Sequence, residues 1–183
     1  KGVDQARALG RRLRRDGTRF DRVYCSTMKR AVRTTGAMFE GMGEADGAYT
    51  EVQALIEQQI PGWRGVPEKV AYTPETVAYM RTKGLDFVPP EGESYRVVQR
   101  RVAGWLEDEI IYNQDLVGKA QSLSVCIVGH GAAFKCLFQY IMGYDDRFVT
   151  RLEVDNCSIS RFGFDRGGWS VLCINDSYHL NDS

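Results

Sequence analysis

The chain has 183 residues, of which 43% are hydrophobic, and this length and apolar content suit one globular domain with a sizeable core. Its 24 basic residues balance 24 acidic ones, so no net field draws it to nucleic acid or to an anionic membrane. No apolar run reaches the length of a membrane span, and no secretory signal pattern occurs. We therefore expect a single domain over residues 1–183, with neither nucleic acid nor a membrane as a partner.

Cysteine usage indicates a reducing compartment. The five cysteines are an odd number and include no Cys-x-x-Cys pair. Cys126 and Cys173 lie in apolar runs typical of strands, where cysteine behaves as a small buried hydrophobe. We therefore expect free thiols and a cytoplasmic protein.

The chain opens with an amphipathic helical pattern. Apolar residues recur at helical spacing at Val3, Ala6, Leu9 and Leu13, and Gly17 follows the last of them. The opposite face carries several arginines. Because the chain as a whole is neutral, we interpret that face as solvated surface and not as a nucleic-acid site.

A strand and a second helix are expected next. Residues 20–25 read as a short strand, with Ser26 as the N-cap of a helix from Thr27 to about Met42. The following segment, 51–59, fits either a strand or a loop.

The middle of the chain predicts an insert with its own helices. Thr73 as N-cap and Pro74 at the first helical position open a helix that Gly84 ends. A long helix is expected over 94–111, followed by a polar connection over 113–121.

The last third predicts a buried strand, a helix and a hairpin. The apolar, β-branched run 123–128 is typical of a parallel strand, and a helix runs from behind His130 to Met142. Residues 158–164 and 169–174 alternate across a glycine turn, which is a hairpin signal. The order of elements predicts an α/β fold, a three-layer α/β/α sandwich with a mostly parallel sheet.

Two of the predicted strands end in reactive groups, and ligands of open α/β sheets bind at the carboxyl ends of strands. Arg30 lies near the end of the first, where a guanidinium can grip two phosphate oxygens. His130 follows the second and can donate a proton or a hydrogen bond to a phosphoryl oxygen. The helix behind it offers the N–H groups of Gly131 and Ala132 to an anion, and Gly131 allows close approach. The alternative interpretations are that Arg30 is an exposed arginine without a ligand and that His130 is a histidine of the core.

Glu57 is a third candidate. It follows two apolar residues and precedes an irregular Pro-Gly-Trp segment, surroundings that suit a general acid, although a surface glutamate is the alternative.

Two separated histidines give no metal-ligand cluster, so neither a metal nor another cofactor is expected. Only four residues separate Cys25 from Arg30, one fewer than the Cys-x5-Arg loop of a cysteine phosphatase, so we reject that class.

Together these elements resemble the histidine phosphatase superfamily, whose fold is phosphoglycerate-mutase-like. Short motifs occur in the family's order along almost the whole chain: Ser26 with Arg30-Ala31, Leu55-Ile56-Glu57, Gly92-Glu93-Ser94 with Arg101-Val102, Val128-Gly129-His130-Gly131, and Asn156 with Ser158-Ile159. Each motif is short and common alone, and their order and spacing carry the resemblance.

The resemblance implies specific roles. Arg30 would bind the transferred phosphoryl group, Glu57 would protonate the leaving oxygen, and His130 with the Gly131 amide would stabilise charge developing at phosphorus. The implied activity is hydrolysis of small phosphomonoesters through a phosphohistidine, with a small phosphorylated metabolite as partner. The alternatives are phosphoglycerate mutase-type phosphoryl transfer and a noncatalytic phosphate-binding pseudoenzyme. A homodimer is compatible with the sequence.

One part of the family pattern is missing. The family's nucleophile stands in an Arg-His-Gly motif that this chain lacks, and its other histidine, His179, resembles a structural position. Three explanations stay open: a segment upstream of Lys1, a short pseudoenzyme and a reordered chain. We expect the first, hence a domain missing its first strand, because a naturally short form would leave two unpaired strand edges.

Overall fold

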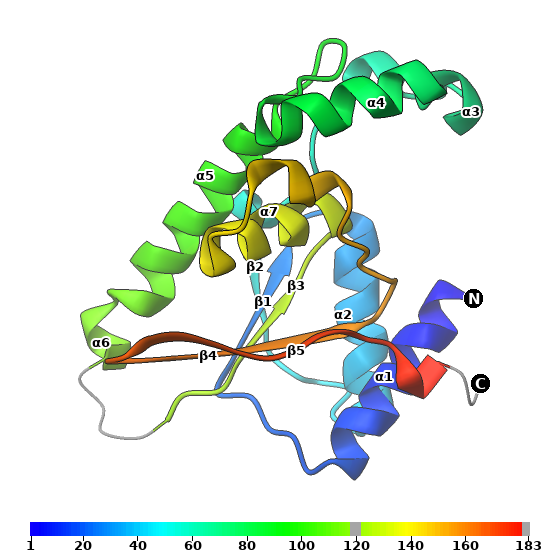
Figure 1. Cartoon of the computed structure of the whole chain (residues 1–183). Helices are drawn as coiled ribbons and strands as arrows, with labels where there is room; N and C mark the ends of the chain where they lie inside the picture. Colours follow the sequence, from blue (N-terminus) through cyan, green and yellow to red (C-terminus); the bar gives the residue numbers. More distant parts are fainter. Residues whose placement is uncertain (118–121, 181–183) are drawn as a thin grey trace. The chain divides into compact units, whose positions relative to one another are not determined.

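The computed structural model (Figure 1) describes residues 1–117 and 122–180. The chain divides into two compact units. Unit 1 consists of Lys1–Ile56, Gln114–His130 and Val154–Ser183. Unit 2 consists of Glu57–Asn113 and Gly131–Glu153. The chain crosses between the units four times, and one of these crossings is the peptide bond between His130 and Gly131.

A three-stranded parallel sheet forms the centre of unit 1. Strand β1 (Arg22–Ser26) lies between β2 (Thr50–Val52) and β3 (Val125–Val128), and both pairings are parallel. This confirms the predicted α/β class with a parallel sheet. Because all three strands run in one direction, the carboxyl ends of β1 and β3 lie at the same edge of the sheet.

Helices α1 (Gly2–Arg15) and α2 (Lys29–Met42) pack closely against each other in unit 1. The core they form with the sheet consists of Leu9, Leu13, Val23, Met38, Phe39 and Met42. Two glycines allow the close approach: a Cβ at Gly10 would overlap the Met38 carbonyl, and one at Gly41 would overlap the Arg7 carbonyl. Side chains at these two positions would force the helices apart.

The predicted hairpin is confirmed in unit 1. Strands β4 (Ile159–Asp165) and β5 (Gly168–Asp176) pair antiparallel, and a 3₁₀ turn over Tyr178–Leu180 follows them. The predicted polar connection contains the short helix α6 (Gln114–Val117), and the rest of that connection, 118–121, lies outside the described residues.

One helix boundary was predicted wrongly. Ser26 is the last residue of β1, where it pairs with Val52, and not the N-cap of α2. The N-cap is Met28, and the helix begins at Lys29. Ladder pairing extended the strand one residue beyond the predicted 20–25, so the serine remained in the sheet. Segment 51–59, which the sequence allowed as either strand or loop, contains the end of β2 and a 3₁₀ turn over Gln53–Leu55.

Unit 2 is helical. Its helices are α3 (Glu68–Ala71), α4 (Pro74–Lys83), α5 (Tyr95–Leu106) and α7 (Gly131–Met142), with a π-helical turn over Glu107–Ile111 and 3₁₀ turns over Pro61–Trp63, Gly84–Asp86 and Asp146–Thr150. The predicted caps of α4 are confirmed, since Thr73 accepts a hydrogen bond from the Thr76 amide and Gly84 has a positive φ. Helices α5 and α7 pack against each other. In the described part of the chain, no helix has the length and apolar character needed to cross a membrane.

Candidate functional site

Arg30 and His130 meet at the carboxyl edge of the unit 1 sheet. Arg30 lies in the first turn of α2, behind β1, and His130 lies two residues after the end of β3. The Arg30 Nε donates a hydrogen bond to His130 Nδ1 across 3.0 Å. The arginine is exposed, whereas the histidine is only 7% exposed. The structure therefore brings together two of the residues that the sequence singled out.

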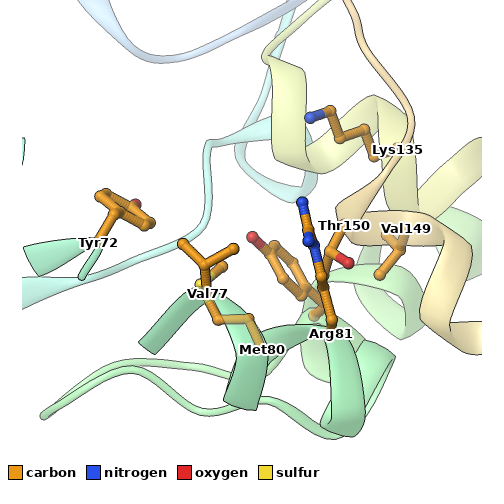
Figure 2. Close-up of a pocket in the computed structure, with 8 residues that line it drawn as sticks. Tyr72, Val77, Met80, Arg81, Lys135, Val149 and Thr150 are labelled. Carbon is orange, nitrogen blue, oxygen red and sulfur yellow. The ribbon is translucent and has the colours of Figure 1, made fainter. Parts of the chain in front are cut away.

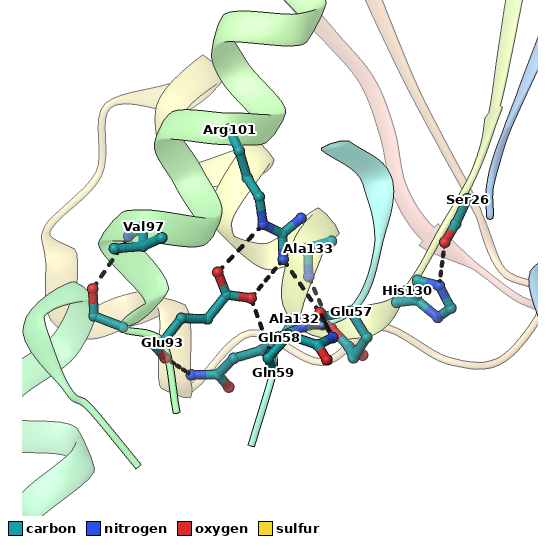
Figure 3. Close-up of polar contacts among 11 residues, drawn as sticks. Ser26, Glu57, Gln58, Gln59, Glu93, Val97, Arg101, His130, Ala132 and Ala133 are labelled. Atoms are coloured by element: carbon teal, nitrogen blue, oxygen red, sulfur yellow. Dashed lines mark hydrogen bonds and ion pairs between the residues drawn. The ribbon is translucent and has the colours of Figure 1, made fainter. Parts of the chain in front are cut away.

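The other ring nitrogen of His130 contacts Ser26, as Figure 3 shows. The distance from His130 Nε2 to Ser26 Oγ is 2.8 Å, and Ser26 is fully buried. Because a guanidinium can only donate, Nδ1 acts as acceptor, and a neutral ring then carries its proton on Nε2 and donates it to the serine. Arg30 thus fixes the tautomer of His130, and Ser26 holds the orientation of the ring. Sequence reasoning missed this role because it assigned the serine to a helix cap.

The Arg30 guanidinium keeps its terminal nitrogens available. Among residues 1–117 and 122–180, its side chain makes no hydrogen bond or ion pair besides the one to His130. Two parallel N–H groups match the spacing of two oxygens on a phosphate or carboxylate. The carboxyl edge of the sheet therefore presents a cation and an imidazole to an anionic ligand.

Glu57 belongs to unit 2, where its carboxylate binds the N-terminal turn of α7 (Figure 3). One oxygen accepts a hydrogen bond from the Ala132 amide at 3.4 Å, and the other accepts from the Ala133 amide at 3.3 Å and from the Gln58 amide at 2.9 Å. A helix N-terminus favours an anion. Of the two amides that the sequence analysis offered to a ligand, Ala132 serves Glu57, and Gly131 is the first residue of α7.

Two further residues surround the backbone of Glu57 and were not marked as functional by the sequence. Arg101 donates to the Glu57 carbonyl oxygen at 3.2 Å and forms an ion pair with Glu93 at 2.8 Å. Both belong to the Gly-Glu-Ser motif and the helix that it begins. Ser94, the N-cap of α5, and Arg101 lie seven positions apart, which is two helical turns and therefore one face. That spacing could have predicted their proximity.

Unit 2 also contains a pocket of about 300 Å³ (Figure 2). Its lining combines apolar, hydroxyl and cationic side chains: Tyr72, Val77, Met80, Arg81, Tyr95, Lys135, Val149 and Thr150. Burial is the main cause that raises the pKa values of Tyr72 and Tyr95, and the negative charge of Glu57 raises both further. The phenols are therefore neutral hydrogen-bonding groups at physiological pH.

The second histidine, His179, lies in the C-terminal 3₁₀ turn of unit 1 and is buried. Arg12 contacts its Nδ1 at 3.5 Å and binds the Asp176 carboxylate through two nitrogens, at 2.9 and 2.7 Å. The described residues contain no group of three or more His, Cys, Asp or Glu side chains that could hold a metal ion.

Comparison with known proteins identifies one family for this chain. The family model of the histidine phosphatase superfamily (branch 1) matches residues 1–177. The 2,3-bisphosphoglycerate-dependent phosphoglycerate mutase of Methylorubrum populi is 27% identical over 156 residues, which cover 84% of this chain and 71% of the mutase. The corresponding mutase of Parvibaculum lavamentivorans is 29% identical over 156 residues, which cover 84% of this chain and 72% of that mutase.

Solved structures share the phosphoglycerate-mutase-like fold. A mycobacterial glucosyl-3-phosphoglycerate phosphatase superimposes with a TM-score of 0.79 at 18% identity, covering 95% of this chain and 84% of that one. Bacillus stearothermophilus YhfR superimposes with a TM-score of 0.77 at 21% identity, covering 97% and 84% of the two chains.

Proposed function

The chain belongs to the histidine phosphatase superfamily, and from that membership we propose that the protein is a phosphatase that hydrolyses small phosphomonoesters through a phosphohistidine intermediate. The contact between Arg30 and His130 carries the proposal, because it sets a bidentate cation beside an imidazole at the carboxyl edge of a parallel sheet. Neither His130 nor His179 stands in an Arg-His-Gly motif, so the proposal assigns the role of nucleophile to neither of them.

The proposed roles follow from the chemistry of the side chains. Arg30 binds two oxygens of the phosphoryl group. His130 stabilises the charge that develops on this group after the ring exchanges one of its two hydrogen bonds, to Arg30 or to Ser26, for one to a phosphoryl oxygen, and the Gly131 amide stabilises the same charge. Glu57, in its protonated form, donates its proton to the ester oxygen as the phosphorus–oxygen bond breaks, and the amides of Ala132 and Ala133 stabilise the carboxylate that remains. Phosphoryl transfer mainly requires that the reacting groups are positioned and that developing charge is stabilised. In this proposal Arg30, Glu57, His130 and the Gly131 amide together meet both requirements.

A phosphoglycerate mutase activity is the second candidate, and the mutases among the curated relatives favour it. Phosphatase is preferred because a mutase has to hold its phosphorylated intermediate away from water, and the segment after Glu57, residues 58–90, is modest compared with the longer insert usual in that branch. The two activities differ in product: a phosphatase releases inorganic phosphate, whereas a mutase returns an isomeric phosphoester.

The proposed partner is a small phosphorylated metabolite. A phosphomonoester matches the cation and the imidazole that Arg30 and His130 bring together. We also propose a cytoplasmic location, which is supported by five cysteines that remain unpaired.

The test uses the protein expressed from its complete reading frame. We expect it to release inorganic phosphate from 4-nitrophenyl phosphate and to carry an acid-labile, base-stable phosphoryl group when quenched during turnover. Absence of both signals would support a noncatalytic phosphate-binding protein. Interconversion of 2- and 3-phosphoglycerate that depends on 2,3-bisphosphoglycerate, without net phosphate release, would support the mutase.

A further inference from the structure

The Gly-Glu-Ser motif in unit 2 performs three structural tasks in succession. Gly92 lets the chain approach the 57–60 segment, because a Cβ there would lie 2.6 Å from the Gln59 carbonyl oxygen. Ser94 caps α5 by accepting a hydrogen bond from the Val97 amide at 3.2 Å. Glu93, between them, is held next to the segment that carries Glu57.

Glu93 is bonded to this segment by its backbone and its side chain. Its amide donates to the Gln59 carbonyl at 3.0 Å, and its carbonyl accepts from the Gln58 side chain at 2.8 Å. Its carboxylate accepts from the Gln59 amide at 2.9 Å. The two residues that follow Glu57 are therefore fixed by one glutamate.

Arg101 links that glutamate to Glu57 itself. Its Nη2 lies 2.8 Å from one oxygen of Glu93, its Nε lies 3.4 Å from the other, and the same Nη2 donates to the Glu57 carbonyl at 3.2 Å. The two side chains are 20% and 18% exposed, so solvent screens this ion pair less than an exposed one. A planar guanidinium holds a fixed angle between its partners, which a lysine cannot reproduce.

We infer that Glu93 and Arg101 are positioning residues that hold Glu57 where it can donate its proton, an inference that rests on the proposed function of Glu57. They fix its backbone from one side, while the amides of Ala132 and Ala133 hold its carboxylate from the other. In the step they serve, the Glu57 proton moves to the ester oxygen as the phosphoryl group passes to the nucleophilic histidine. The alcohol leaves neutral and Glu57 is left as a carboxylate.

The dependence of rate on the leaving group tests this inference. Phenolate is a more basic leaving group than 4-nitrophenolate and needs the acid more, so phenyl phosphate and 4-nitrophenyl phosphate are compared as substrates of the full protein. We expect Glu57→Gln to lower kcat for phenyl phosphate about 10²-fold and to affect 4-nitrophenyl phosphate far less. Arg101→Met should show the same selectivity at about tenfold, with KM little changed.

Matched variants separate positioning from folding. Arg100→Met removes the neighbouring exposed arginine and should leave both rates unchanged. Arg101→Lys should recover part of the phenyl phosphate rate. The double variant of Glu57→Gln and Arg101→Met should be no slower on phenyl phosphate than Glu57→Gln alone, because Arg101 acts through Glu57.

Each result has one interpretation. Equal losses on both substrates in Arg101→Met would assign the pair a purely structural role and overturn the inference, while the proposed function would stand if Glu57→Gln remained selective. If Glu57→Gln is itself unselective, the proposed acid and this inference both fail. If Arg101→Met does not fold, Glu93→Gln, which conserves side-chain shape, takes its place. Its loss of kcat on phenyl phosphate is then compared with its loss on 4-nitrophenyl phosphate.

Discussion

Arg30 Nε donates a hydrogen bond to His130 Nδ1 across 3.0 Å, although the two residues lie 100 positions apart along the chain. The parallel pairing of β1 with β3 makes this contact possible, because it places the segments that follow both strands at one edge of the sheet. The remaining nitrogens of the guanidinium are then available for an anion that also meets the imidazole.

We expect Arg30→Ala to lower kcat/KM for 4-nitrophenyl phosphate by at least about 10²-fold, because the loss removes a charge-assisted, bidentate contact to the phosphoryl group. Arg30→Lys should recover little, since a lysine provides a point charge without the fork. The control is Arg33→Ala, which removes an exposed arginine one turn further along α2. Its kcat/KM for 4-nitrophenyl phosphate should equal that of the unaltered protein. Wild-type kinetics in Arg30→Ala would refute the proposed phosphate site.

Ser26→Ala tests the hydrogen bond that holds the ring of His130, and spectra of the imidazole test its tautomer. The change removes the hydroxyl that accepts from His130 Nε2, at a cost of about 1–3 kcal/mol, so we expect a less stable protein and a roughly tenfold lower kcat/KM. Long-range ¹H–¹⁵N spectra of the imidazole should show the proton on Nε2 in the unaltered protein. Ser170→Ala, at an exposed position of β5, should change neither property. A proton on Nδ1 in the unaltered protein would contradict the assignment.

Local patterns predicted most of the fold and only part of the site. The helices, the hairpin and the caps at Thr73 and Gly84 follow from spacing within a few residues, so the sequence revealed them. The contact of Ser26 with His130 spans 104 positions and depends on which strands pair, and no local pattern encodes that pairing.

Glu57 illustrates the same limit. Its candidacy came from apolar neighbours, but its contacts lie with the α7 amides, 75 and 76 residues away. The family resemblance identified the Gly-Glu-Ser motif as a pattern, and only the structure shows that its glutamate binds the segment after Glu57.

The close approach of α1 and α2 predicts opposite effects for two glycines of α2. Gly41→Ala would push a methyl group into the Arg7 carbonyl and should destabilise the protein by about 1–3 kcal/mol. At Gly36 an added Cβ meets no atom of the described residues within 4 Å, so Gly36→Ala should be neutral or stabilising by about 0.5–1 kcal/mol. Urea unfolding of both variants measures the difference, and similar midpoints would contradict the packing.

Acid should destabilise unit 1 in two steps. Burial and the nearby Arg12 lower the pKa of His179 below its usual 6.5, so the unfolded chain binds the proton more readily and stability falls as the pH drops below about 6.5. Arg12 lowers the pKa of Asp176 to about 2, so a second loss follows below about pH 4.

Urea unfolding across pH 7.5 to 3 would display both steps. His179→Asn removes the titrating imidazole, so it should flatten the upper step and leave the lower one. An upper step that persists unchanged in His179→Asn would assign it to another group.

The two units are each discontinuous along the chain, and this limits how relatives can exchange parts by recombination. A crossover that replaced only Glu57–Asn113 would pair a foreign α5 with the resident α7 and would separate Glu93 and Arg101 from the helix whose amides bind Glu57. Gly131–Glu153 would have to be inherited with it. We therefore expect unit 2 to be exchanged intact only as two co-inherited stretches of gene, with the peptide bond after His130 as one of the required breakpoints.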